Sequence, residues 1–280
     1  MGRVAYVLSG GSSLGAVQAG MALALAEDGI SPDLIVGTSA GALNGSWLAG
    51  GKDEAGLIDL WRRLDRRALF PLQPVVGLQA FLGRRDHFVP NDGLRRLLEQ
   101  ELTFRHLEDA TIPFACLATD IVSGAEAVLH RGPAVESILA SSALPGVFPP
   151  VELDGRLLFD GGIANNTPIS TAIDLGAEEV WVLSTGYSCG LQTPPDSALA
   201  LALHGVGLLV QQRLVRETQR TYPVPVHLIP PPCPIDVSPV DFSQTDELIE
   251  MAHAGTRQWL ANGRPNAQPL VVPHAHRARN

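Results

Sequence analysis

Cysteine is scarce in this sequence of 280 residues, and the three cysteines present, Cys116, Cys189 and Cys233, lie far apart. None belongs to a CxxC pair, and none stands with histidines at the spacing of zinc ligands. These absences argue against a disulfide framework and against a metal site. We therefore expect no metal, no cofactor and a reducing compartment, the cytoplasm, as the location of the protein.

Basic clusters are missing as well. The arginines occur in scattered pairs, and the formal net charge of the chain is −9. Binding to a phosphate backbone needs a concentrated positive surface, so nucleic acid is not expected as a partner.

Long apolar runs are also absent. No run reaches the roughly 18 residues that a membrane-spanning helix needs. The longest candidate, residues 198–210, is interrupted by His204, Gly205 and Gly207. The apolar N-terminal stretch is interrupted at positions 10–13, which argues against a signal peptide. We expect a protein that does not span a membrane, with peripheral contact to a membrane left open.

The residues that are present indicate a globular protein with a large core, since 45% are hydrophobic and only 18% are charged. Apolar strand-like runs alternate with helical segments, which predicts an α/β fold. At this length we expect a single domain over residues 1–262, followed by a polar tail over residues 263–280.

The segment 33–44 gives the strongest local signal, because an apolar run breaks into Gly-x-Ser-x-Gly and then into helix-forming residues. This pattern predicts a nucleophile elbow, in which a tight strand-to-helix turn projects a serine hydroxyl above the sheet. Gly37 and Gly41 leave room on either side of Ser39. The free N–H groups of the following helix point to the place where negative charge would develop. Ser39 is the candidate nucleophile, and an ordinary strand-to-helix turn is the alternative.

A second glycine-rich loop lies between a predicted strand over residues 4–8 and a predicted helix over residues 16–26. It has Ser12 where a dinucleotide-binding loop needs glycine, and no lysine follows Gly15 as a P-loop requires. The remaining functional interpretation is an oxyanion hole made of backbone N–H groups, and a plain β–α turn is the alternative. Right-handed crossover places this loop and the elbow at the same edge of a parallel sheet.

The other predicted elements alternate in the same way. Strands are expected over residues 34–36, 112–121, 125–130, 152–159 and 180–185, and over 226–229. Helices are expected over residues 42–48, 54–64, 92–102, 135–142, 168–175, 199–219 and 245–260. Within these, 152–159 is predicted to be a hairpin with an Asp-Gly turn, and Thr167 is expected to cap the helix that begins at Pro168.

Residues 66–90 have little periodicity, three prolines and several large apolar side chains. A loop of this length inside a compact domain is typical of a lid or a binding wall. A packed cover over the core would explain the same composition.

Asp160 follows the predicted hairpin and precedes Gly161 and Gly162. An aspartate there is a common turn residue. By the parallel-sheet argument it would also face the edge that holds Ser39, where the two glycines would let the backbone approach the nucleophile. A carboxylate, with an ordinary pKa of about 3.9, serves as a base only within hydrogen-bond reach of the serine in a site that excludes water.

Four motifs together resemble the patatin-like phospholipase family in their order and approximate spacing. They are Gly10-Gly11-x-x-x-Gly15, Gly37-Thr38-Ser39-Ala40-Gly41, the segment Ala140 to Pro150, and Asp160-Gly161-Gly162. The resemblance implies a three-layer α/β/α fold with a mainly parallel central sheet. It also implies a lipid acyl-ester hydrolase of the phospholipase or esterase type that uses a Ser–Asp dyad.

The resemblance assigns roles by position. Ser39 would be the nucleophile, Asp160 the general base, and the amides of Gly10, Gly11 and Ser12 the oxyanion hole. One departure affects the substrate: the family's loop usually has a third glycine and a basic residue, where this sequence has Ser12 and Leu14. Without a nearby cation, a less charged ester becomes a better candidate than a phosphate head group.

Three alternatives stay open. An α/β-hydrolase triad would use His204 or His227 as its base, but no late histidine loop is recognisable. A catalytically weak lipid-binding or regulatory protein could retain the same pocket. An acyltransferase would form the same acyl-enzyme and pass the acyl group to an alcohol instead of water.

Overall fold

The structure is a computed structural model that describes residues 2–65, 69, 86–186, 198–233, 235, 237 and 241–264. Most of the expected lid segment 66–90 and most of the expected tail lie outside the described residues. Of that segment, Phe88 and Val89 are described, and their N–H groups donate to the carbonyls of Gly146 and Val147.

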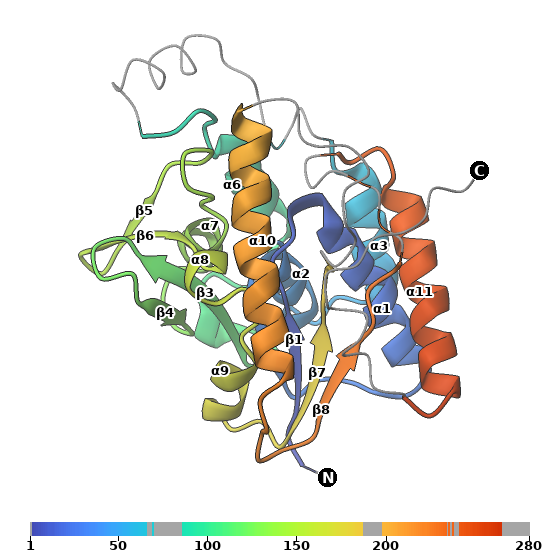
Figure 1. The fold of residues 1–280 in the computed structure, drawn as a ribbon. Helices are drawn as coiled ribbons and strands as arrows, with labels where there is room; N and C mark the ends of the chain where they lie inside the picture. Colours follow the sequence, from blue (N-terminus) through green and yellow to red (C-terminus); the bar gives the residue numbers. More distant parts are fainter. Residues whose placement is uncertain are drawn as a thin grey trace.

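A mixed sheet of eight strands forms the centre of the described part of the chain, with helices on both faces (Figure 1). The strand order is β5-β6-β3-β2-β1-β7-β8, and β4 pairs with β3 outside this path. The strands are β1 (Val4–Leu8), β2 (Leu34–Thr38), β3 (Phe114–Asp120), β4 (Glu126–Leu129), β5 (Val151–Leu153), β6 (Arg156–Asp160), β7 (Glu179–Leu183) and β8 (Val226–Ile229).

The helices occupy the connections between these strands, except for the last helix, which follows β8. They are η1 (Ser12–Gly15), α1 (Ala16–Glu27), α2 (Ala40–Ala49), α3 (Glu54–Arg63), α6 (Asp92–Glu101), η2 (Leu107–Asp109), α7 (Ala134–Ser141), α8 (Gly162–Asn165), α9 (Ile169–Asp174), α10 (Ala198–Thr218) and α11 (Thr245–Ala261). None of the described helices is both long and apolar enough to cross a bilayer.

Strands β3, β2, β1, β7 and β8 run parallel, as a chain of alternating strands and helices predicts. Strands β4 and β6 are both antiparallel to β3, and β5 and β6 form the predicted hairpin. Its turn residues Asp154 and Gly155 have positive φ values of 50° and 70°, which suits the Asp-Gly sequence. The expected three-layer fold is confirmed.

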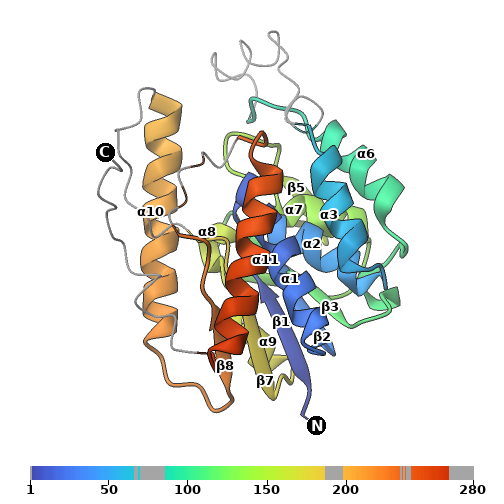
Figure 2. The same cartoon turned by 90° about the vertical axis from the view of Figure 1, so that its right-hand side faces the viewer.

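Side chains of β1 alternate between two cores, one on each face of the sheet. Tyr6 and Leu8 belong to the larger core, which α1, α2 and α11 cover, whereas Val7 faces a smaller cluster that includes Ile169 of α9. Figure 2 shows α11 lying along α1. The two helices approach closely because α1 has Gly20 at the contact, where a side chain would collide with α11. Both faces of the parallel sheet are therefore buried.

The chain after Asp160 differs from the expectation. A short helix, α8, follows directly, and α9 begins at Ile169 without a side-chain cap. Thr167 does not cap α9, because Pro168 (φ −80°, ψ 59°) forms a tight three-residue turn in which the Ile169 N–H donates to the Thr167 carbonyl. The Thr167 hydroxyl is buried, and no residue in the described part of the chain forms a hydrogen bond with it.

Candidate active site

The elbow between β2 and α2 holds Ser39 in a strained backbone conformation, with φ 54° and ψ −119°. Few non-glycine residues adopt this conformation, and such strain occurs mainly at functional sites. Gly37 and Gly41, the glycines on either side of Ser39, are required by close contact with neighbouring backbone. A side chain at Gly37 would collide with the carbonyl of Gly41, and one at Gly41 would collide with the carbonyl of Leu8.

The hydroxyl of Ser39 donates a hydrogen bond of 2.7 Å to Oδ2 of Asp160. The other carboxylate oxygen, Oδ1, accepts a bond of 2.7 Å from the N–H of Gly162. The side chain of Asp160 is therefore oriented from both sides, and the residue is only 5% exposed. The structure brings together the two residues that the sequence singled out as nucleophile and base.

Burial raises the pKa of Asp160 from 3.8 to about 6, although the bonds from Gly162 and Ser39 lower it. At neutral pH the group is still mainly ionised. It is also a stronger base than an exposed aspartate, which suits proton transfer near neutral pH.

Asp160 reaches this edge by a route that the sequence analysis did not foresee. The parallel-sheet argument was wrong, because β6 is antiparallel to β3. Strand β3 extends beyond β2, so that Leu117 pairs with Thr38 and the next residue, Ala118, pairs with Asp160. Strand β6 thus runs toward the elbow from beyond the end of β2. Its last residue, Asp160, lies level with the residue after Thr38, which is Ser39.

The loop after β1 lies directly beside the nucleophile, since a Cβ on Gly10 would be 3.1 Å from the Cβ of Ser39. The N–H of Gly10 is already bonded to the carbonyl of Asn166 at 3.3 Å. The N–H groups of Gly11 and Ser12 donate to no other described residue. Of the three expected oxyanion donors, these two are the ones with a free N–H in the described part of the chain.

Ser12 and Leu14, the two departures in this loop, have distinct structural consequences. Ser12 has φ 53°, a value that glycine adopts freely and that costs an ordinary residue about 1 kcal/mol. Leu14 is buried in the main core at 1% exposure. At the position where the family usually has a basic residue, this chain therefore has a leucine that packs in the core.

A buried polar network supports the loop, and the sequence analysis missed it. Gln18 of α1 donates to the carbonyls of Ser9 (2.8 Å) and Leu183 (2.9 Å). Asn44 of α2 donates to the carbonyl of Gly15 (2.9 Å) and to Oε1 of Gln18 (2.8 Å). Gln18 and Asn44 are fully buried, so their bonds fix the loop against both α1 and α2.

Two more side chains bind the loop at the carbonyl of Gly10. The carbonyl of Gly10 accepts hydrogen bonds from Oγ1 of Thr185 (2.8 Å) and from Nδ2 of Asn166 (3.2 Å). Thr185 follows β7, and Asn166 follows α8. Asn166 lies just beyond the Asp-Gly-Gly motif. The consecutive polar residues Asn165 and Asn166 were therefore the sequence signal that could have indicated this contact.

Histidines do not join the dyad within the described residues. Four pair with carboxylates elsewhere: His87 with Asp86, His106 with Asp109, His227 with Glu179 and His253 with Glu27. His227, one of the two triad candidates, lies on the outermost strand β8 in register with Trp181, and the centres of the two rings are 4.4 Å apart. It is therefore engaged away from the edge that holds Ser39.

Comparison with known proteins points to one family. The patatin-like phospholipase family model matches residues 6–173. A patatin-like phospholipase domain-containing protein of Caenorhabditis elegans is 33% identical over 197 residues, which are 65% of this chain and 14% of that protein. The lysophospholipase NTE1 of Mycosarcoma maydis is 31% identical over 187 residues, which are 65% of this chain and 10% of that protein. The chain thus matches only a small part of these relatives.

The fold is also found among solved structures. VipD from Legionella pneumophila aligns with 93% of this chain and 67% of its own, with a TM-score of 0.51 and 16% sequence identity. At this identity the likeness concerns the fold alone.

Proposed function

The chain belongs to the patatin-like phospholipase family, and on that premise we propose that it hydrolyses acyl esters of lipids, with Ser39 as nucleophile and Asp160 as general base. The observation on which the proposal depends is the 2.7 Å hydrogen bond from the Ser39 hydroxyl to the buried Asp160 carboxylate. A serine alone is a weak nucleophile, and an adjacent base is what activates it.

In the first half of the proposed reaction, Oγ of Ser39 attacks the ester carbonyl carbon while its proton passes to Oδ2 of Asp160. The N–H groups of Gly11 and Ser12 donate to the oxyanion that forms. Asp160 then returns the proton to the oxygen of the leaving alcohol. The carbon–oxygen bond breaks, and the acyl group remains on Ser39.

In the second half, water attacks the acyl carbon and gives its proton to Asp160. Oγ of Ser39 leaves the tetrahedral intermediate and takes that proton back, so the free carboxylic acid departs and the dyad returns to its starting state. An alcohol in place of water would give acyl transfer, so products of both kinds are to be measured.

The loop composition supports a weakly charged ester as the substrate. Leu14 is in the core, so this loop places no cation beside Ser39. A glyceride or another uncharged ester fits such a loop better than an ester whose phosphate must bind there. The substrate range is tested with a panel of lipid esters that differ only in head-group charge.

Exposed apolar side chains near the dyad support peripheral contact with a lipid surface. Ile121 and Val122 (91% exposed) lie at the end of β3, and Leu157 and Ile163 each lie three residues from Asp160. The N–H of Ile121 bonds to the carbonyl of Leu157, and α8, which carries Ile163, packs on β3, so these residues come from neighbouring elements. Such a patch beside a lipid-cleaving site is where a membrane-borne substrate would enter.

The central test is labelling of the purified chain with a fluorophosphonate probe, together with a chromogenic-ester assay. We expect labelling at Ser39 alone, and loss of both labelling and ester turnover in Ser39→Ala. Ser123→Ala is the matched control, because Ser123 is exposed in the β3–β4 turn and bonds only locally. Unchanged labelling of Ser39→Ala would refute the proposed nucleophile. Lipid binding without labelling would favour the non-catalytic alternative.

A further inference from the structure

The end of helix α7 contacts the backbone of both dyad residues. Oγ of Ser141 accepts a hydrogen bond of 2.9 Å from the N–H of Ser39. The carbonyl of Ser141 accepts one of 3.2 Å from the N–H of Gly161, and the carbonyl of Ala143 accepts one of 2.9 Å from the N–H of Asp160. Two residues, Ser141 at the end of α7 and Ala143 just beyond it, thus accept three N–H groups from both sides of the Ser39–Asp160 hydrogen bond.

Among these contacts, the one from Ser141 acts at the strained position. The conformation of Ser39 is unfavourable by about 1–3 kcal/mol and persists only where its surroundings enforce it. Ser141 is fully buried, so without its hydroxyl the N–H of Ser39 would lose its partner in a site where water cannot simply replace it. A backbone that relaxed there would carry Oγ of Ser39 away from Asp160.

We propose that Ser141 is a positioning residue for the dyad: its hydroxyl holds the amide of Ser39 so that the nucleophile stays within hydrogen-bond reach of Asp160. This inference rests on the proposed Ser39–Asp160 function. The side chain of Ser141 bonds to the Ser39 amide and makes no hydrogen bond to Asp160 itself, so it acts through the backbone and takes no proton in the reaction.

Helix α7 is well suited to hold a fixed position. It packs against β3, β5 and β6, and Arg95 of α6 pairs with Glu136 at 2.9 Å. The helix also supplies a matched control in Ser137, which is equally inaccessible at 1% exposure and donates its hydroxyl to the carbonyl of Pro133 one turn away. Ser137→Ala removes a buried hydroxyl from α7 without touching the dyad.

The experiment compares Ser141→Ala with Ser137→Ala for fluorophosphonate labelling rate, kcat and KM on a chromogenic ester, and thermal unfolding. A displaced nucleophile lowers rates by about 10–100-fold, so we expect that loss in kcat and in labelling for Ser141→Ala, with KM within about threefold. Ser137→Ala should stay within about twofold of wild type in both rates. Similar melting temperatures in the two variants would separate positioning from stability.

The pH profile adds a readout that a purely structural role would not move. The hydrogen bond from Ser39 lowers the pKa of Asp160, so loosening it should shift the acidic limb of kcat/KM to higher pH in Ser141→Ala. If Ser141→Ala does not fold, Ser141→Cys keeps the shape with a weaker acceptor and should give an intermediate loss. Wild-type rates in the folded variant, or an equal loss in Ser137→Ala, would overturn the inference. Absence of labelling in the wild type would instead refute the dyad itself.

Discussion

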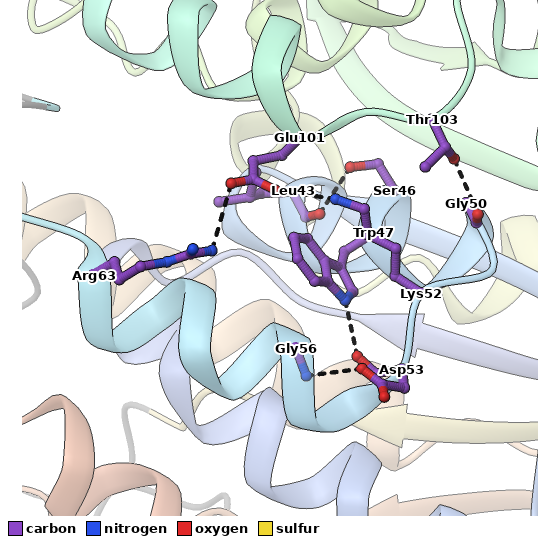
Figure 3. Close-up of polar contacts among 10 residues, drawn as sticks. All are labelled: Leu43, Ser46, Trp47, Gly50, Lys52, Asp53, Gly56, Arg63, Glu101 and Thr103. Atoms are coloured by element: carbon purple, nitrogen blue, oxygen red, sulfur yellow. Dashed lines mark hydrogen bonds and ion pairs between the residues drawn. The ribbon is translucent and has the colours of Figure 1, made fainter.

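The two ends of helix α2 differ in the contacts that they make and in what those contacts do. At its N-terminus Ser39 has a strained backbone, a buried carboxylate stands beside it, and glycines are enforced by collision. At its C-terminus, shown in Figure 3, Trp47 donates to the carbonyl of Asp53 at 2.9 Å, and Lys52 lies 3.8 Å from the centre of the indole ring. Lys52 also pairs with Glu101 of α6 at 3.0 Å.

The contacts at the C-terminal end of α2 are a helix cap, hydrogen bonds and an ion pair, which are contacts that stabilise a fold. Asp53 caps α3 by accepting from the N–H of Gly56 at 2.9 Å, and Thr103 donates to the carbonyl of Gly50 at 3.0 Å. The N-terminal end instead retains features that lower stability. The difference suggests that one helix joins a reactive end to a supporting end, and variants at the two ends should separate activity from stability.

The largest expected effect is on activity at the N-terminal end. Asp160→Asn keeps the shape of the side chain and removes the base, so kcat should fall by about 10³-fold or more. His204→Ala and His227→Ala should each stay within roughly tenfold of wild type, because neither is needed as a base. Steady-state kinetics on folded protein measure both. A histidine variant as inactive as Ser39→Ala would replace the dyad with a triad.

The next effect is on stability at the C-terminal end. Trp47 is only 8% exposed and belongs to the main core, so Trp47→Ala should lower the free energy of unfolding by about 3–5 kcal/mol. Trp47→Phe, which loses the N–H but keeps most of the ring, should lose about 1 kcal/mol. Denaturant unfolding measures both, and kcat per folded molecule should change less than threefold. A large loss of kcat in the folded fraction would mean that the two ends are coupled.

A smaller and opposite stability effect is expected at Asp160. Its pKa is about 6 in the folded chain and 3.8 ordinarily, so folding favours the protonated form. The stability from this group is complete below pH 3.8 and is lost as the pH rises through 6. At pH 8 the ionised group therefore costs up to about 3 kcal/mol, taking 1.36 kcal/mol for each pKa unit.

Asp160→Asn has no such charge, so it should be more stable than wild type by about 1–3 kcal/mol at pH 8, less near pH 5 and not at all below pH 4. Thermal unfolding across this pH range measures the difference. A variant that is less stable than wild type at pH 8 would show that the hydrogen bonds to the carboxylate outweigh its burial.

The sequence could predict the features of this site that depend on local patterns. Gly-x-Ser-x-Gly after an apolar run places Ser39 in an elbow, because the collisions that demand glycine involve residues close by in the chain or on the neighbouring strand. The Asp-Gly turn likewise predicts the β5–β6 hairpin from two residues.

The features that could not be predicted depend on distant contacts. Ser141 meets Ser39 across 102 residues of sequence, and Asn166 meets Gly10 across 156. Neither contact produces a periodic pattern in the sequence that could indicate it. The antiparallel direction of β6 was missed for the same reason, since a strand's partner is set by packing and not by its own sequence.

The smallest expected effect tests whether the C-terminal end of α2 contributes to stability alone and not to activity. Asp53 is the N-cap of α3, and Asp53→Ala should lower stability by about 1 kcal/mol, because the N–H of Gly56 loses its acceptor. Asp59→Ala is the matched control. Asp59 is a well-exposed aspartate of the same helix, and its ion pair with Arg62 at 3.4 Å should be worth less than about 0.5 kcal/mol. Denaturant unfolding should separate the two variants while both keep wild-type kcat. The capped first turn of α3 meets α2 at Trp47, whereas the contact of α3 with Asn44, made by Trp61 at 2.7 Å, lies about two turns further along α3. If Asp53→Ala instead lowered kcat by tenfold at full folding, the loss of a cap would have been transmitted along α2 to the elbow, and the division between a reactive and a supporting end would fail.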